Sequence, residues 1–328
     1  MNLENHKILV TGVGAIIGYG IVRSLRQIQP IPTIIGMDIY EDAIGQIWCD
    51  KFMQGERADS QNYADFVLKV VAKEQVDLII PGIEQDIDAL VKILPDLQRA
   101  GARVVLNSAS ALNTFNDKLA TSELLQAMDL PWIPTLHSGE TTPQQAQDEL
   151  GLPLIAKPIT SYAGKGLSIL RNEQELRNYC NRDDYILQRY IENGTEFTAS
   201  VFGLGDGSFC NPIILQRTLG PDGATHKAHT IESQEILEQM SVLCKETRPE
   251  GPTNFQFINS AELPEYRLLE VNPRISSSTS LRAHFGVNEA HMCIQFYLQN
   301  KKPEAANQKK GTARRYIEDH VEYDRDHL

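Results

Sequence analysis

The chain lacks the features that mark several protein classes. Its 328 residues include five cysteines and no C-x-x-C pair, which argues against a disulfide framework or a zinc knuckle and for reduced thiols. No apolar run reaches the roughly 18 residues of a membrane helix, and the polar first residues predict no signal peptide. Lysine and arginine number 31 against 43 acidic residues, a net charge of -12, which repels phosphate backbones. We therefore expect a cytoplasmic protein without membrane or nucleic-acid partners.

The residues that are present predict a folded protein of two or three units. In the first third, short apolar segments such as Lys7–Thr11 and Thr33–Asp38 alternate with amphipathic segments of helical period, which is typical of a doubly wound parallel sheet. We place this unit at residues 1–110. From Leu152 onward short strands dominate, which indicates mixed or antiparallel sheets. The predicted fold class is therefore α/β plus α+β.

A glycine loop follows the first predicted strand. Gly12, Gly14 and Gly18 form G-x-G-x-x-x-G between a strand and a helix, and Asp38 ends the second strand. Such a loop can hold a dinucleotide, with phosphates at the helix N-terminus and the acid on the ribose. A nicotinamide-dependent oxidoreductase is therefore one open interpretation. The other is that the glycines only let the strand and the helix pack closely.

A second glycine loop lies in segment 155–167, IAKPITSYAGKGL. A strand delivers Lys157, and Ser161, Gly164 and Gly166 follow with a further lysine between them. The Walker A spacing is absent, but small residues, free backbone N–H groups and two cations suit a phosphate. The segment predicts a phosphate-binding loop, with an exposed hairpin turn as the alternative.

Two later strands carry polar residues at alternate positions. Gln256 lies within NFQFIN, and Glu270, Asn272 and Arg274 lie two apart in LEVNPR. Residues two apart in a strand face the same side. Their oxygens suit Mg²⁺, and Arg274 could neutralise the charge of a transferring phosphoryl group. These strands predict a metal site, with a solvated sheet face as the alternative.

The order of these motifs resembles the ATP-grasp superfamily. The segments NFQFIN and LEVNPRISSSTSL are similar to the synthetase domains of the carbamoyl-phosphate synthase large subunit, and the resemblance covers nearly the whole chain. It implies a pre-ATP-grasp domain at residues 1–110 and a small ATP-grasp subdomain with the glycine-rich loop at 111–190. A C-terminal ATP-grasp subdomain with the metal site would occupy 191–328.

The resemblance also implies ATP and Mg²⁺ as cofactors and assigns residue roles. The implied nucleotide-binding residues are Lys118, Lys157, Ser161, Gly164, Gly166, Gln188, Tyr190, Ile191 and Glu196. The implied metal ligands are Gln256, Glu270 and Asn272, and the implied catalytic residues are Arg274 and Lys157. In this scheme the backbone of segment 188–191 contacts the adenine edge, Glu196 binds the ribose, and segment 161–166 covers the phosphates.

Four further residues are candidates for substrate binding: Gly14, Glu84, Lys227 and Arg282. Lys227 lies in segment 223–231, which we expect to be a loop between a strand and a helix, and a solvated lysine is the alternative. Glu84 could hold an amine, or it could be an acid that complements the dipole of a helix N-terminus. Arg282 could grip a substrate carboxylate in bidentate fashion.

The single synthetase unit is more similar to ligases that join a carboxylate to an amine than to a full carbamoyl-phosphate synthase. The resemblance implies that ATP phosphorylates the carboxylate and that the amine then displaces phosphate. Small-molecule carboxylates and amines are the expected partners, and a homodimer is the protein partner considered. The nicotinamide-dependent oxidoreductase and a non-catalytic nucleotide sensor are the alternative interpretations.

Overall fold

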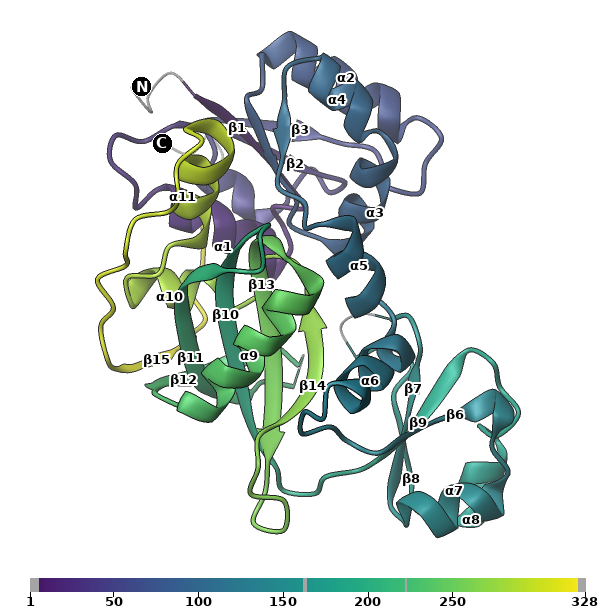
Figure 1. Ribbon diagram of the computed structural model, residues 1–328. Coiled ribbons are helices and arrows are strands. Elements are labelled where there is room, and N and C mark those ends of the chain that lie inside the picture. Colours follow the sequence, from purple (N-terminus) through teal and green to yellow (C-terminus); the bar gives the residue numbers. More distant parts are fainter. Residues whose placement is uncertain (1–5, 162–163, 222, 324–328) are drawn as a thin grey trace.

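Three β-sheets organise the computed structural model, which describes residues 6–161, 164–221 and 223–323 (Figure 1). The first is a parallel sheet of strand order β3-β2-β1-β4-β5. Its strands are β1 (Lys7–Thr11), β2 (Thr33–Asp38), β3 (Lys51–Gln54), β4 (Leu78–Ile80) and β5 (Arg103–Val104). Its helical segments are α1 (Ile16–Leu25), η2 (Ile44–Trp48), α2 (Tyr63–Glu74), α3 (Glu84–Lys92) and α4 (Leu94–Arg99). Ile8, Val10 and Ile34 are fully buried, as expected for strands covered on both faces, and the predicted parallel sheet is confirmed.

The second sheet is small and antiparallel, with the order β6-β9-β7-β8. Its strands are β6 (Thr135–His137), β7 (Leu154–Pro158), β8 (Ser168–Leu170) and β9 (Tyr185–Arg189). The helical segments around it are α5 (Ala109–Phe115), α6 (Lys118–Ala127), η3 (Ser138–Glu140), α7 (Pro143–Leu150) and α8 (Glu173–Arg177). Leu154, Leu170 and Leu176 form its core. In Figure 1, α6 lies between this sheet and strand β14 (Arg267–Asn272).

The third sheet is antiparallel, with the order β14-β13-β10-β11-β12-β15. Its other strands are β10 (Thr195–Leu204), β11 (Phe209–Leu219), β12 (Thr225–Ile231), β13 (Glu250–Asn259) and β15 (Thr312–Arg314). The helical segments of this part are α9 (Gln234–Thr247), α10 (Thr279–His284), α11 (Glu289–Cys293) and the π-helical turn η4 (Ile294–Leu298). The antiparallel sheets confirm the α+β part of the predicted fold class.

Helix α9 covers one face of the third sheet. Ser233 caps it, because its hydroxyl accepts from the Ile236 N–H at 3.3 Å. Ile236, Met240 and Leu243 repeat at helical spacing and are fully buried in one cluster with Phe255. The opposite face of the sheet carries Phe202, Ile213 and Leu215, which belong to another buried cluster, together with the polar side chains described below.

One local prediction was wrong. Segment 223–231 was expected to be a loop, but Thr225–Ile231 forms β12, which pairs with β11 and β15. The buried residues of this strand are Thr225 and Ala228. They are three positions apart, so the sequence does not show the two-residue period that is typical of a strand. Helix α6 begins after Asp117, whose side chain caps it by accepting from the Ala120 N–H at 2.9 Å.

The three sheets fall within the three expected domain ranges, whose boundaries stay predictions. The first and third parts nevertheless share a core, since Val13 and Ile21 belong to the same buried cluster as Phe202, Leu281 and Ile294. Within the described ranges, none of the helices combines the length and the apolar character needed to span a bilayer.

Candidate functional site

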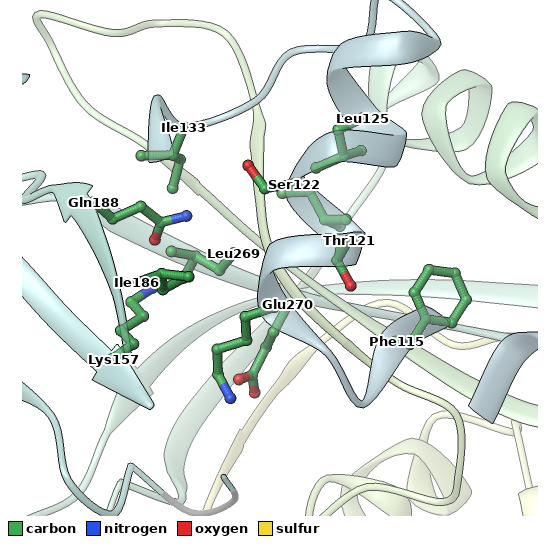
Figure 2. Close-up of a pocket in the computed structure, with 12 residues that line it drawn as sticks. Phe115, Thr121, Ser122, Leu125, Ile133, Lys157, Ile186, Gln188, Leu269 and Glu270 are labelled. Carbon is green, nitrogen blue, oxygen red and sulfur yellow. The ribbon is translucent and has the colours of Figure 1, made fainter. Parts of the chain in front are cut away.

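A pocket opens where the small sheet faces α6 and β14. The residues that line it are Phe115, Lys118, Thr121, Ser122, Leu125, Ile133, Lys157, Ile186, Gln188, Leu268, Leu269 and Glu270. Figure 2 shows Lys157 and Gln188 on one side, Thr121 and Ser122 of α6 on the other, and Glu270 between them. The pocket therefore joins the predicted nucleotide-binding and metal-binding segments.

Two lysines carry the positive charge of this pocket. Lys157 lies in β7 opposite Ile186 and is only 9% exposed. Burial lowers its pKa to about 8, opposed by the attraction of Glu270 and reinforced by the nearby positive charge of Lys118. Burial also lowers the pKa of Lys118, and the Glu270 carboxylate opposes that shift. Keeping two neighbouring, desolvated ammonium groups charged costs free energy unless an anion binds beside them.

The second glycine loop begins beside Lys118. Lys118 Nζ donates to the carbonyl and the hydroxyl of Ser161 at 3.1 and 3.2 Å. Gly164 and Gly166 follow with φ of +68° and +79°, a region that favours glycine. The predicted phosphate loop also includes residues 162–163, which lie outside the described residues.

Gln188 brings an unpartnered acceptor to the pocket. Its Nε2 donates to Thr135 Oγ1 at 2.8 Å, while its buried Oε1 has no hydrogen-bond partner among the residues that the structure describes. Figure 2 shows the amide directed into the pocket. A buried acceptor without a donor costs roughly 1–3 kcal/mol, so this oxygen favours a ligand that offers an N–H group.

Seven side chains form a continuous hydrogen-bonded chain, here called the polar row. Its members are, in order, Glu196, Arg217, Gln256, Glu270, Asn272, Arg274 and Glu84. In the first half, Arg217 donates to Glu196 Oε2 at 2.7 Å and also to Gln256 Oε1. Gln256 Nε2 then donates to Glu270 Oε1 at 2.6 Å.

The second half of the polar row repeats this order. Arg274 Nη2 donates to Glu84 Oε2 at 3.0 Å and to Asn272 Oδ1 at 2.8 Å. Asn272 Nδ2 donates to Glu270 Oε1 at 3.1 Å. Glu270 is therefore the centre of the row, held by two amides that are each held by an arginine.

The orientation of both amides follows from this arrangement. A guanidinium can only donate and an ionised carboxylate can only accept. An amide between the two must therefore present its oxygen to the arginine and its nitrogen to Glu270. Sheet register supplies the placement, because Gln256 pairs with Glu270 and Glu196 pairs with Arg217, and paired residues share a face.

The polar row fits Mg²⁺ by the chemistry of its donors. Mg²⁺ takes oxygen ligands, commonly one or two carboxylates together with substrate phosphates. Glu270 offers the carboxylate. Gln256 and Asn272 offer amide oxygens, each of which would give up its hydrogen bond from an arginine in order to bind the ion. In the described part of the chain no cluster of three or more His, Cys, Asp or Glu side chains could hold a metal, so a ligand phosphate would complete this set.

Arg282 was predicted to grip a substrate, and the structure places it in the core instead. Its side chain is fully buried, with Nη1 3.1 Å from Glu289 Oε1 and 3.0 Å from Ser276 Oγ. Its Nη2 donates to Thr198 at 2.9 Å and to Asn254. The protein supplies an acid and further acceptors for both terminal nitrogens, as a buried arginine requires, while the buried Nε has no partner among the described residues.

Lys227 does not face the polar row. Ala228 pairs with Arg217 and shares its face, so the adjacent Lys227 points to the opposite side of the sheet. The prediction that Lys227 contacts the substrate relied on a loop that is a strand. Its exposed side chain agrees with the solvated alternative.

The first glycine loop is held by hydrogen bonds and close contacts within the first sheet region. The Gly14 N–H donates to Asp38 Oδ2 at 2.8 Å, and the Tyr40 N–H donates to Oδ1 at 3.1 Å. A Cβ on Gly18 would lie 2.0 Å from the carbonyl oxygen of Gly12. These contacts favour the packing interpretation, and they place Gly14 against Asp38.

The remaining predicted residues, Glu84, Tyr190 and Ile191, are not among those that line the pocket. Glu84 opens α3 as a helix N-terminal acid and joins the polar row through Arg274. Tyr190 and Ile191 follow the end of β9, and the Tyr190 N–H donates to the Pro153 carbonyl at 3.2 Å. Arg217 was missed, since only the register of β10 and β11 places it beside Glu196.

Comparisons with known proteins agree with this architecture. A family model described as ATP-grasp in the biosynthetic pathway with Ter operon matches residues 181–320. The N-terminal section of the carbamoyl phosphate synthase large chain of Methanopyrus kandleri is 22% identical over 283 residues, which cover 79% of this chain and 50% of that protein. The large chain of Methanosarcina mazei is 25% identical and is covered over 22% of its length. The chain thus spans half or less of the length of these relatives.

Solved structures share the fold. The biotin carboxylase domain dimer of the Hydrogenobacter thermophilus 2-oxoglutarate carboxylase, in complex with MgADP and bicarbonate, matches 93% of this chain and 73% of its own at a TM-score of 0.72 and 18% identity. The N5-carboxyaminoimidazole synthetase of Staphylococcus aureus matches 94% of this chain and 82% of its own at a TM-score of 0.72 and 15% identity. The chain is thus similar in sequence to an ATP-grasp family over residues 181–320, and it shares the fold of these two solved structures over 93% and 94% of its length.

Proposed function

We propose that the protein is an ATP-dependent ligase that activates a carboxylate as an acyl phosphate and joins it to an amine, releasing ADP and phosphate. The observation that carries this proposal is the placement of the buried Lys157 and the half-buried Lys118 beside Glu270 at the junction of two sheets. The crystallised relative from Hydrogenobacter thermophilus holds MgADP on the same fold, which supports ATP as the nucleotide.

ATP would bind in the pocket between the small sheet and β14. Lys118 and Lys157 would hold its phosphates, because an anion restores the stabilisation that burial removes from both ammonium groups. The free Oε1 of Gln188 would accept an N–H of the base. Glu196 would bind the ribose through its Oε1, to which no described residue donates.

Mg²⁺ would be held by Glu270 with the oxygens of Asn272 and Gln256, and when bound it would neutralise charge on the phosphates. Arg274 would stabilise the charge that develops as the phosphoryl group moves to the carboxylate. It is held in place by Glu84 and Asn272 at 3.0 and 2.8 Å. The segment that begins at Ser161 would cover the site and exclude water from the acyl phosphate.

Small carboxylates and amines are the partners that this chemistry requires. Glu84 is the acid on the side of the first sheet, where the carboxyl ends of parallel strands bind ligands. We propose that it contacts the amine.

A cytoplasmic location is supported by the five free cysteines, and a homodimer is supported by the dimeric relative from Hydrogenobacter thermophilus.

The oxidoreductase interpretation depends on Asp38 as the acid that binds the ribose. Each Asp38 oxygen accepts a backbone N–H of the protein, so this acid has a structural role in the loop that needs no ribose. A non-catalytic sensor would need neither Arg274 nor a complete set of metal ligands. The ligase is therefore the function that the site supports best.

The proposal is tested by measuring ADP release with Mg²⁺ and ATP over a matrix of carboxylates and amines. We expect one carboxylate class to stimulate ADP release, and a matching amine to raise it further while an amide product forms. ADP release that no carboxylate stimulates would contradict the ligase proposal. Omitting Mg²⁺ and omitting each substrate in turn are the controls.

Nucleotide affinity should fall as pH rises through about 8, the pKa to which burial lowers Lys157. Below this pH the free protein carries the charged lysine that the phosphates need. Above it, binding must first restore the proton, so the affinity for ADP should fall by up to about tenfold per pH unit. Calorimetry in buffers of different ionisation enthalpy should detect this proton uptake.

Arginine at position 157 provides the control, because a guanidinium keeps its charge over this range. Lys157→Arg should show a flatter pH profile than the wild-type protein, whatever its absolute affinity. Equal profiles in the two proteins would mean that Lys157 does not contact the phosphates.

Gly164→Val should weaken ATP binding by about tenfold, because a β-branched residue in the left-handed region costs roughly 1–2 kcal/mol and distorts the loop. Among the described residues, a Cβ at Gly164 would meet only Leu167 Cδ1, at 3.7 Å, so the expected effect comes from the backbone conformation. Titration with ATP measures the effect.

Gly101→Val is the matched control. Gly101 also has a positive φ, of +93°, with nothing within 4 Å of a Cβ, but it lies in the turn between α4 and β5. This variant should bear similar backbone strain and bind ATP normally. Equal losses in both variants would remove the loop from the nucleotide site.

A further inference from the structure

Arg217 is the member of the polar row to which the proposed function gives no role. It lies in β11, and 7% of its side chain is exposed. Its Nε and Nη2 are 3.2 and 2.7 Å from Glu196 Oε2, and Nη2 also donates to Gln256 Oε1. One guanidinium thus contacts both the acid assigned to the ribose and the amide assigned to the metal.

We propose that Arg217 is a positioning residue that couples nucleotide binding at Glu196 to magnesium binding at Glu270. This inference rests on the proposed function, since it takes the ribose and the metal to bind where that function places them. Arg217 itself would touch neither ligand. It would set the orientation of two side chains that do.

On the nucleotide side, Arg217 directs Glu196. Both guanidinium nitrogens bond to the same carboxylate oxygen, Oε2. The other oxygen, Oε1, has no donor among the described residues and is left for a hydroxyl. Without Arg217 the Glu196 side chain, which is 26% exposed, would lose its fixed orientation.

On the metal side, Arg217 fixes the orientation of the Gln256 side-chain amide. With its oxygen held by Arg217, Gln256 must turn its nitrogen toward Glu270 Oε1, 2.6 Å away. Gln256 is thus a contact shared by Arg217 and the central carboxylate. A change at Arg217 would reach Glu270 through this one residue.

A lysine can reproduce only part of this geometry. Its single ammonium group can pair with Glu196, but it lacks the planar fork that serves two acceptors at once. Arg217→Lys should therefore keep most of the nucleotide contact and lose the link to Gln256. Arg217→Met should lose both.

The alternative is that the pair only braces two neighbouring strands, since Glu196 and Arg217 are cross-strand partners. A brace would affect thermal stability and would leave ligand affinities alone. The two possibilities therefore differ in ADP binding, measured by calorimetry with and without Mg²⁺.

For Arg217→Met we expect the ADP affinity measured with Mg²⁺ to fall by at least about tenfold, the size of a lost charge-assisted contact. For Arg217→Lys we expect ADP affinity without Mg²⁺ within about twofold of wild type, but a larger gain on adding Mg²⁺, because the ion no longer has to displace a guanidinium from Gln256 Oε1. Arg26→Met is the matched control, because Arg26 makes an ion pair with Asp50 at 2.9 Å and bonds to the Trp48 carbonyl. It should bind as wild type does.

Wild-type ADP affinity and an unchanged gain from Mg²⁺ in the folded Arg217→Lys protein would overturn the inference and leave a strand brace. Because this variant keeps the charge, it decides the question even if Arg217→Met does not fold, which a thermal melt would reveal. A wild-type protein that binds no ADP under either condition would instead overturn the proposed function, and this inference with it.

Discussion

Replacing Glu270 with alanine should abolish Mg²⁺-dependent ADP formation, with a loss on the order of a thousandfold or more, while the protein stays folded. Glu270 is the central acceptor of the polar row, with Gln256 and Asn272 at 2.6 and 3.1 Å from its Oε1. It is also the carboxylate that opposes the lowering of the lysine pKa values at positions 118 and 157. The change therefore removes the proposed metal ligand and should weaken both proposed phosphate contacts.

The fold should survive because Glu270 lines a pocket and does not fill a core. Circular dichroism and a thermal melt would verify this, and ADP formation over a range of Mg²⁺ concentrations would measure the loss. Glu262→Ala is the matched control, since Glu262 is an exposed acid in the turn between β13 and β14. Wild-type turnover in Glu270→Ala would remove Glu270 from the metal site.

Arg274→Lys should lower kcat by roughly 100- to 1000-fold, the typical result of losing one stabilising donor of a developing charge. ATP affinity should change little, because this side chain is assigned to the transferring group and lies outside the set that lines the pocket. The arginine donates to Glu84, Asn272 and the Ile275 carbonyl at once. A lysine keeps the charge but cannot hold that planar arrangement.

Equilibrium titration with ATP and product formation at saturating substrates separate the two effects. An unchanged kcat would refute the role of Arg274 in the chemical step. A large loss of ATP affinity at normal kcat would make Arg274 a phosphate clamp instead.

Much of the candidate site could be predicted because it lies within single strands. Glu270, Asn272 and Arg274 alternate along one strand end, so sequence spacing alone places them on one face. Gln256 joins them because β13 and β14 are neighbours in both sequence and space. In such a hairpin, short-range pattern and three-dimensional contact coincide.

Residues whose role depends on contacts between distant segments could not be predicted. Arg217 is placed by the register of β10 against β11, which no local pattern in LQRTL reveals. Arg282 resembles a substrate clamp in sequence, but Glu289 and Asn254 draw it into the core. Asp38 has the spacing of a ribose-binding acid, and backbone N–H groups already satisfy both of its oxygens.

The most direct test is a calorimetric titration of the wild-type protein and Lys157→Met with Mg²⁺ and ATP, and in parallel with NAD⁺. We predict that the wild-type protein binds ATP and not NAD⁺, and that Lys157→Met loses at least about tenfold in ATP affinity, as expected when a buried charged contact to a phosphate is removed. Binding of NAD⁺ that is unaffected by Lys157→Met, with no binding of ATP, would contradict the nucleotide site between the small sheet and β14 and the ligase built on it.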